Sequence, residues 1–157
     1  MVSQTEKRKV DHIKLCVEKD VAFKEKTTLL ECVELDYKTL PEIALDDVNL
    51  ETEFLGKTFS TPLMVSAITG GSQISKKINR DIAKACQELG IGMGLGSMRA
   101  MIESPSIADT YYVRDVAPDI FLAGNIGAAQ LREYSPEIIN KALESVGADA
   151  LAIHLNA

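Results

Sequence analysis

From about residue 60 onward, short apolar runs alternate with longer stretches in which apolar residues recur every three or four positions. The runs begin near Pro62, Ile91, Ile120 and Asp149, about 29 residues apart, which is the length that one strand, one helix and two short loops require. Within each run the apolar residues follow one another directly, as in parallel strands covered on both faces. The pattern predicts four strands connected by three helices.

The stretches between the runs carry the usual signals of helix ends. In residues 72–90, Ser72 is a candidate N-cap and Gly90 suits a left-handed C-terminal position. In residues 135–147, Pro136 stands at the first helical position and the stretch ends at Gly147. The expected apolar stripes are Ile74, Ile78, Ile82, Ala85 and Leu89 in the first helix, and Ile138, Ile139, Ala142, Leu143 and Val146 in the second. Ser104-Pro105 opens a third, less regular helix.

Two architectures fit this repeat, an open doubly wound sheet and the first half of a (β/α)8 barrel. The even spacing favours the barrel, because every unit of a barrel has the same role. We therefore expect an α/β fold in which residues 61–157 supply the first four strands of a TIM barrel.

Residues 1–60 have a different pattern. Residues 8–23 can form a helix with Val10, Ile13, Val17 and Val21 on one side, and residues 49–62 alternate around Gly56-Lys57 as a hairpin does. We interpret residues 1–60 as an N-terminal cap of helix and β-hairpin laid against the barrel.

Composition narrows the class of protein. The chain has 157 residues, is 46% apolar and carries a formal charge of −6, which disfavours general binding to nucleic acid or to anionic lipid. Its three cysteines show no metal-ligand spacing, and no stretch has the roughly 18 apolar residues of a membrane span. We expect a soluble, cytoplasmic protein with reduced thiols, no membrane association and no nucleic-acid partner.

Candidate chemistry gathers where the strands end, which in barrels is the catalytic face. Gly70 and Gly71 would let a flat ligand approach the backbone, or simply form a tight turn. Ser97 and Arg99 suit a phosphate or carboxylate, although a surface salt bridge would also account for Arg99. Gly92, Gly94 and Gly96 match a dinucleotide fingerprint poorly, and close packing explains Gly92 and Gly94 better.

Four further positions have a functional and a structural interpretation. Asn125 could recognise the edge of a heterocycle or cap a loop. His154 could bind an anion or transfer a proton, or it could be a core residue. Arg8 and Lys9 stand at the start of the first predicted helix, where the helix dipole favours a bound anion. Alternatively, they are solvated charges near the end of the chain.

Six stretches together resemble, in order and spacing, the N-terminal part of the type 2 isopentenyl-diphosphate isomerase family. They are "RKVDHI" (8–13), "LPEI" (40–43), "PLMVSAITGG" (62–71), "GLGSMRA" (94–100), "GNIGAAQL" (124–131) and "DALAIHLN" (149–156). The resemblance implies an FMN-binding TIM barrel that interconverts isopentenyl and dimethylallyl diphosphate with reduced FMN, NADPH as reductant and Mg²⁺. It also implies a homo-oligomer.

Site residues follow from the resemblance by matching position. Those implied at the cofactor are Ala67, Ile68, Thr69, Gly70, Ser97 and Asn125. Those implied at the diphosphate substrate are Arg8, Lys9, Ser97, Met98, Arg99, His154 and Asn156. No metal ligand is expected in this chain, and reduced flavin is the expected acid-base partner. Ile68 and Met98 depart from the family pattern, which usually has Met and Gln there, and Met98 removes an amide that could touch the substrate.

A whole barrel needs about 250 residues. We therefore expect the chain to be a fragment, inactive alone, whose first and fourth strands have unpaired edges. Two alternatives remain open. One is another FMN-dependent TIM-barrel oxidoreductase, of the 2-hydroxyacid oxidase or IMP dehydrogenase kind. The other is a half-barrel assembly piece without enzymatic activity.

Overall fold

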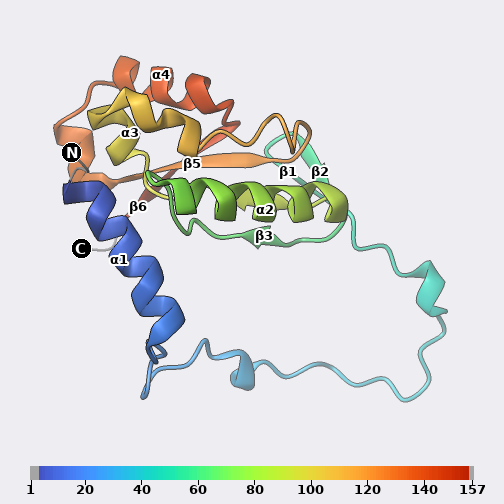
Figure 1. Cartoon of the computed structure of the whole chain (residues 1–157). Coiled ribbons are helices and arrows are strands. Elements are labelled where there is room, and N and C mark those ends of the chain that lie inside the picture. The colour runs from blue at the N-terminus through green and yellow to red at the C-terminus, as the bar shows by residue number, and fades with distance from the viewer. Residues whose placement is uncertain (1–3, 156–157) are drawn as a thin grey trace.

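A parallel sheet of four strands organises the protein (Figure 1). The computed structural model describes residues 4–155. The strands follow one another across the sheet in chain order, namely β3 (Met64–Val65), β4 (Gly92–Gly94), β5 (Leu122–Gly127) and β6 (Ala150–His154). Sequential order of parallel strands is the arrangement found in a barrel wall.

The helices between the strands share one hydrophobic core with the sheet. These helices are α2 (Gln73–Leu89), α3 (Arg99–Glu103) and α4 (Pro136–Val146). The core joins side chains of all three helices to those of β4 and β5, including Cys86, Met93, Met101, Leu122 and Val146. A doubly wound sheet would place helices on both faces. The shared core and the strand order therefore agree with the partial barrel expected from the spacing.

The helix ends lie close to where the sequence predicts them. The Ser72 hydroxyl accepts a hydrogen bond from the Ser75 N–H at 3.1 Å, and Gly90 and Gly147 end their helices with φ of 62° and 66°. The less regular helix expected at Ser104-Pro105 is confirmed as a 3-10 helix, η3 (Pro105–Thr110). The short α3 before it was not predicted.

The buried face of α2 differs from the apolar stripe expected for it. Its buried residues are Ser75, Asn79, Ala83 and Cys86, whereas Ile74 is 47% and Leu89 61% exposed. The polar side chains can be buried because they hydrogen-bond within the protein.

The N-terminal part begins with α1 (Gln4–Glu18), which ends before the predicted residue 23. Asp20 stops it, because its carboxylate accepts from the Ala22 N–H in a local turn. The hairpin pairs β1 (Thr52–Phe54) with β2 (Lys57–Phe59). Its turn residues are Leu55 and Gly56, both with positive φ, and not the predicted Gly56-Lys57.

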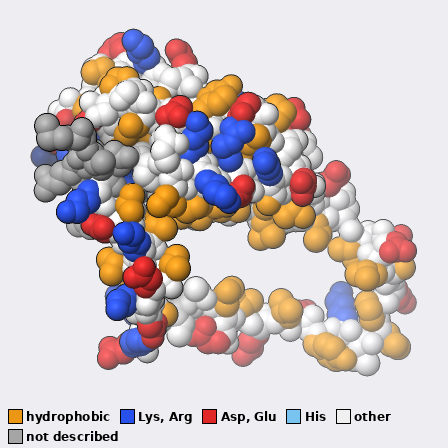
Figure 2. All heavy atoms as spheres, viewed as in Figure 1, with side chains coloured by type: hydrophobic (Ala, Val, Ile, Leu, Met, Phe, Trp, Pro, Cys, Tyr) orange, Lys and Arg blue, Asp and Glu red, His pale blue; other side chains and the backbone are white. Residues whose placement is uncertain are grey.

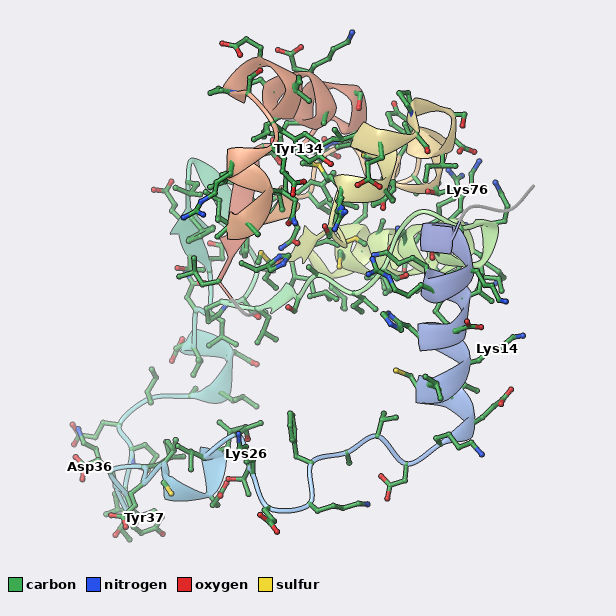
Figure 3. All side chains as sticks on the ribbon, turned by 90° about the vertical axis from the view of Figure 1, so that its left-hand side faces the viewer. Lys14, Lys26, Asp36, Tyr37, Lys76 and Tyr134 are labelled. Carbon is green, nitrogen blue, oxygen red and sulfur yellow. The ribbon has the colours of Figure 1, made fainter. Side chains whose placement is uncertain are left out.

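The hairpin reaches the sheet through aromatic contacts. The rings of Phe54 and Phe59 lie 5.2 Å and 5.8 Å from that of Phe121, just before β5. Between α1 and the hairpin, residues 19–50 contain two 3-10 turns, η1 (Leu30–Cys32) and η2 (Leu45–Asp47), and follow a wide exposed path (Figures 1 and 3). The expected boundary near residue 60 stays a prediction.

Many apolar side chains lie on the surface. Phe23, Leu35 and Leu40 of the long segment are at least 80% exposed, and Leu63 and Ile68 beside β3 are about 60% exposed. Figure 2 shows hydrophobic side chains along the border of the main body that faces this segment. Among the described strands, β3 pairs only with β4, and β6 only with β5. Both outer strands thus have an open edge, as expected.

Across residues 4–155, no helix has both the length and the apolar character needed to cross a membrane. The three cysteines are free thiols, with Cys86 buried in the core.

Candidate active site

The carboxyl ends of the four strands meet at one end of the sheet. Three backbone hydrogen bonds extend the sheet beyond β4 and hold these ends side by side. The Gly96 N–H donates to the Thr69 carbonyl at 3.2 Å, the Leu95 N–H to Ala123 at 2.8 Å, and the Met98 N–H to Asn125 at 2.8 Å. The segments that contain the predicted cofactor residues are thereby locked together.

Glycine is required where β4 passes the segment after β3. A Cβ on Gly96 would overlap the carbonyl group of Thr69, and one on Gly94 would lie 3.1 Å from the Ala67 nitrogen. The interpretation of Gly94 as a close-packing glycine is therefore confirmed. Ala67 and Ile68, in the segment after β3, are exposed residues.

Next to these exposed residues lies a buried polar cluster that sequence reasoning missed. The Thr69 hydroxyl lies 2.9 Å from that of Ser75, which is 2.7 Å from that of Ser72. The Asn79 amide donates to the carbonyls of Thr69 at 3.3 Å and Thr110 at 3.1 Å. The spacing of the polar residues 72, 75 and 79 on one helix face was the signal that could have revealed the cluster.

Tyr111 connects the same segment to β4. Its ring packs so closely on Gly70 that a Cβ there would overlap it, and its hydroxyl donates to the Ser97 carbonyl at 3.0 Å. The side chain is fully buried, and this burial raises the pKa of Tyr111 far above its usual value. Tyr111 thus acts as a neutral donor that fixes Ser97.

The predicted substrate residues after β4 separate in space. Ser97 is partly exposed, whereas the Met98 side chain is completely buried in the core, away from the open side. Arg99 is exposed and donates from Nε to Oε1 of Glu103 at 2.6 Å, so the salt bridge considered for it is present. This partner raises the pKa of Arg99 by hydrogen bonding and by its negative charge.

Glu103 also accepts from the Tyr134 hydroxyl at 3.3 Å. Figure 3 labels Tyr134 where η4 (Ala128–Arg132), α3 and α4 approach one another.

Asn125 and His154, which were predicted at the ends of neighbouring strands, contact each other directly. Nδ1 of His154 lies 2.9 Å from Oδ1 of Asn125. Gly127 lies opposite His154 in the parallel register, and Asn125 opposite Ala152. Both side chains therefore lie on one face of the sheet. Asn156 lies outside the described residues.

Arg8 and Lys9 belong to α1. The first turns of this helix lie near the end of the body where α2 begins (Figures 1 and 3). Lys9 is partly buried, and burial together with the neighbouring charge of Arg8 lowers the pKa of Lys9.

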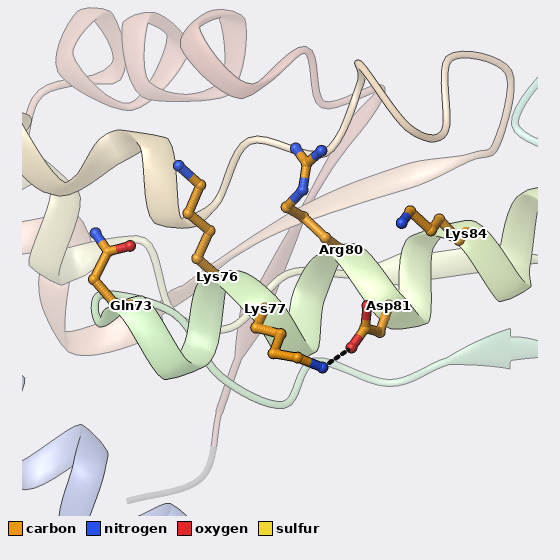
Figure 4. Close-up of a pocket in the computed structure, with 6 residues that line it drawn as sticks. All are labelled: Gln73, Lys76, Lys77, Arg80, Asp81 and Lys84. Atoms are coloured by element: carbon orange, nitrogen blue, oxygen red, sulfur yellow. Dashed lines mark hydrogen bonds and ion pairs between the residues drawn. The ribbon is translucent and has the colours of Figure 1, made fainter.

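A second group of cations, on the outer face of α2, has a structural explanation (Figure 4). Lys77 pairs with Asp81 at 2.7 Å, Lys76 with Asp109 at 2.8 Å and Arg80 with Asp115 at 2.7 Å. These ion pairs neutralise Lys76, Lys77 and Arg80 and disfavour anion binding on this face.

Comparison with known proteins finds similarity along almost the whole chain. The profile described as FMN-dependent dehydrogenase matches residues 2–154. The chain is 45% identical over 157 residues to an isopentenyl-diphosphate delta-isomerase of Methanosarcina mazei, covering 99% of this chain and 43% of the relative. It is 48% identical over 164 residues to the enzyme so named from Pyrococcus abyssi, covering 99% and 44%. The chain thus spans less than half the length of these curated relatives.

Proposed function

The chain belongs to the FMN-dependent dehydrogenase family, and on this premise we propose that it supplies the flavin-facing part of an isopentenyl-diphosphate delta-isomerase. The reaction would interconvert isopentenyl and dimethylallyl diphosphate by moving one double bond. The observation that carries the proposal is the set of backbone bonds that holds the segments of Ala67, Ser97 and Asn125 side by side.

The residues present fit FMN. Ala67 and Ile68 are exposed and could lie along the flavin, and Gly94 and Gly96 let their segment pack closely against the neighbouring strand. Ser97 and Asn125 add a hydroxyl and an amide at the same end of the sheet, which suits the polar edge of a heterocycle. Thr69 would contribute through its backbone, since its hydroxyl bonds to Ser75.

When bound and reduced, FMN supplies the group that gives and takes the proton in the double-bond shift. The role of this chain is to bind and orient. NADPH is the proposed reductant of the flavin.

The proposed diphosphate contacts are cationic. Arg8 and Lys9 stand next to each other on α1, and their mutual repulsion helps to lower the pKa of Lys9. A diphosphate between them would relieve that repulsion. Arg99 would complete the anion site after exchanging its Glu103 partner for the ligand. Ser97 and His154 would contact the substrate beside it, and Asn156 is proposed from the resemblance alone.

For Mg²⁺ the described residues do not supply a site. Within residues 4–155, no three or more His, Cys, Asp or Glu side chains gather where they could hold an ion. The proposal therefore assigns no step to a metal held by this part of the protein. A homo-oligomeric state and a cytoplasmic location are further proposals that rest on the resemblance.

The test uses the protein in the form that its gene encodes. Incubated with FMN, NADPH, Mg²⁺ and isopentenyl diphosphate, it should convert the substrate to dimethylallyl diphosphate without consuming NADPH in proportion to product. Oxidation of a 2-hydroxyacid in proportion to flavin reduction, with no isomerisation, would instead identify a different enzyme of the same family.

A further inference from the structure

The contact between Asn125 and His154 determines which nitrogen of the imidazole carries a hydrogen. Oδ1 of the amide can only accept a hydrogen bond. Because it lies 2.9 Å from Nδ1 of His154, that nitrogen must be the donor. In a neutral imidazole the other nitrogen, Nε2, is then left without a hydrogen.

We propose that Asn125 is a positioning residue that holds His154 in its Nδ1–H tautomer, so that Nε2 is the only ring atom free to gain or lose a proton. The use of this nitrogen in catalysis rests on the proposed function, whereas the tautomer does not.

Asn125 is itself held firmly enough to serve this purpose. Asn125 is only 8% exposed, and its backbone carbonyl accepts from the Met98 N–H at 2.8 Å. It sits in the centre of β5, which pairs with β6 over five residue positions. The sheet therefore fixes the backbone from which the buried amide extends toward His154.

Gly127 gives the ring its space. A Cβ at this position would overlap Oε1 of Gln130 and would lie 2.9 Å from Nε2 of His154. The φ of Gly127 is −76°, which any residue can adopt, so the close approach of these two side chains and not the backbone favours glycine here. Asn125 thus accepts from one nitrogen of the imidazole, and the absence of a side chain at Gly127 leaves space beside the other.

The tautomer can be read by nitrogen NMR of the protein labelled with ¹⁵N-histidine, at alkaline pH where free histidine is neutral. His12, which is exposed on α1, provides an internal reference. The variants His154→Gln and His12→Gln assign the two signals. We expect His154 to show a protonated Nδ1 and a bare Nε2, opposite to the Nε2–H form that free imidazole side chains prefer.

Two variants of Asn125 separate positioning from a general structural effect. Asn125→Asp keeps an acceptor oxygen and should retain the Nδ1–H form. Asn125→Ala removes the acceptor, and His154 should revert to the tautomer of His12. Gly127→Ala leaves Asn125 intact but displaces the ring, and it should also lose the Nδ1–H form.

A predominant Nε2–H form of His154 in the unmodified protein, or an unchanged tautomer in Asn125→Ala, would overturn the inference. This readout requires no substrate. An Nδ1–H form without isomerase activity would therefore contradict the proposed function while leaving the positioning role intact.

Discussion

At the scale of single residues, the candidate site depends on polar side chains that the protein buries. Ser75 and Asn79 occupy the inner face of α2, where an amphipathic pattern would place apolar residues, and Ser72 caps the start of the helix. They interact with the segment after β3 and with Thr110, and so fix the backbone that the flavin is proposed to touch. Sequence reasoning predicted the candidate ligand contacts from the resemblance. It missed these supporting residues because hydrogen-bond partners distant in sequence cannot be read from periodicity.

Asn79→Ala tests this support. It leaves the Thr110 carbonyl without the amide donor and weakens the hold on Thr69, so we expect a loss of about 1–3 kcal/mol in the free energy of unfolding. Gln73→Ala, at an exposed position of the same helix, should change it by less than about 0.5 kcal/mol. Urea unfolding measures both. Equal free energies of unfolding for the two variants would contradict the supporting role of Asn79.

Arg99 is expected to be restrained by its ion pair. Glu103→Gln removes the negative partner, so binding of inorganic pyrophosphate should tighten about two- to five-fold, the effect of a surface ion pair. Glu144→Gln, an exposed acid of α4, is the control for the change in net charge. Titration calorimetry at low ionic strength measures both. If pyrophosphate binding tightens equally in the control, the change reflects net charge, and release of Arg99 does not explain it.

Tyr111 makes stability sensitive to alkaline pH. Burial raises its pKa in the folded protein, while in the unfolded chain it ionises near pH 10. The contribution of neutral Tyr111 to the free energy of unfolding is therefore complete below about pH 10. It is lost as the pH rises further, and the free energy of unfolding then falls with a slope approaching about 1.4 kcal/mol per pH unit. Urea unfolding at a series of pH values should show a shallower decline in Tyr111→Phe. Tyr37→Phe, at an exposed position, should decline as the parent does; if all three decline alike, Tyr111 is not the cause.

At the scale of elements, the strands and main helices follow from short-range signals. Apolar runs, Ser72 and two glycines at helix ends mark them in the sequence. Short-range signals do not predict the short α3 or the exact position of the hairpin turn, because contacts with neighbouring elements determine both. Leu55, for example, adopts a positive φ that its residue type disfavours.

Arg114 joins elements that no local pattern connects. Its guanidinium donates to the carbonyls of Gly147 at 2.8 Å and Ile120 at 2.7 Å, and to Asp149 Oδ2 at 2.7 Å. The same Asp149 oxygen accepts from the Leu122 N–H at 2.8 Å. Arg114 thereby ties the end of α4 to the starts of β5 and β6.

Arg114→Lys should consequently lower the free energy of unfolding by about 2–3 kcal/mol, because a single ammonium cannot reach these acceptors together. Arg132→Lys, exposed on η4, is the matched control and should be nearly neutral. Thermal and urea unfolding measure the difference. If Arg114→Lys leaves the free energy of unfolding unchanged, the hydrogen bonds of Arg114 add little to stability.

At the scale of the whole molecule, the described residues form an open barrel wall with apolar surface on the long segment and beside β3. Even spacing of the runs predicted the wall, since a repeated unit reveals itself in a single sequence. The path of residues 19–50 could not be predicted, because it has little regular structure and few buried contacts.

The central claim is that one end of this sheet is a flavin surface, and a titration with FMN tests it most directly. Protein in the form that its gene encodes should quench FMN fluorescence and saturate at one FMN per chain. Asn125→Ala should weaken binding at least several-fold, while His12→Gln should leave it unchanged. If FMN stays fully fluorescent with the folded protein in excess, the claim is wrong.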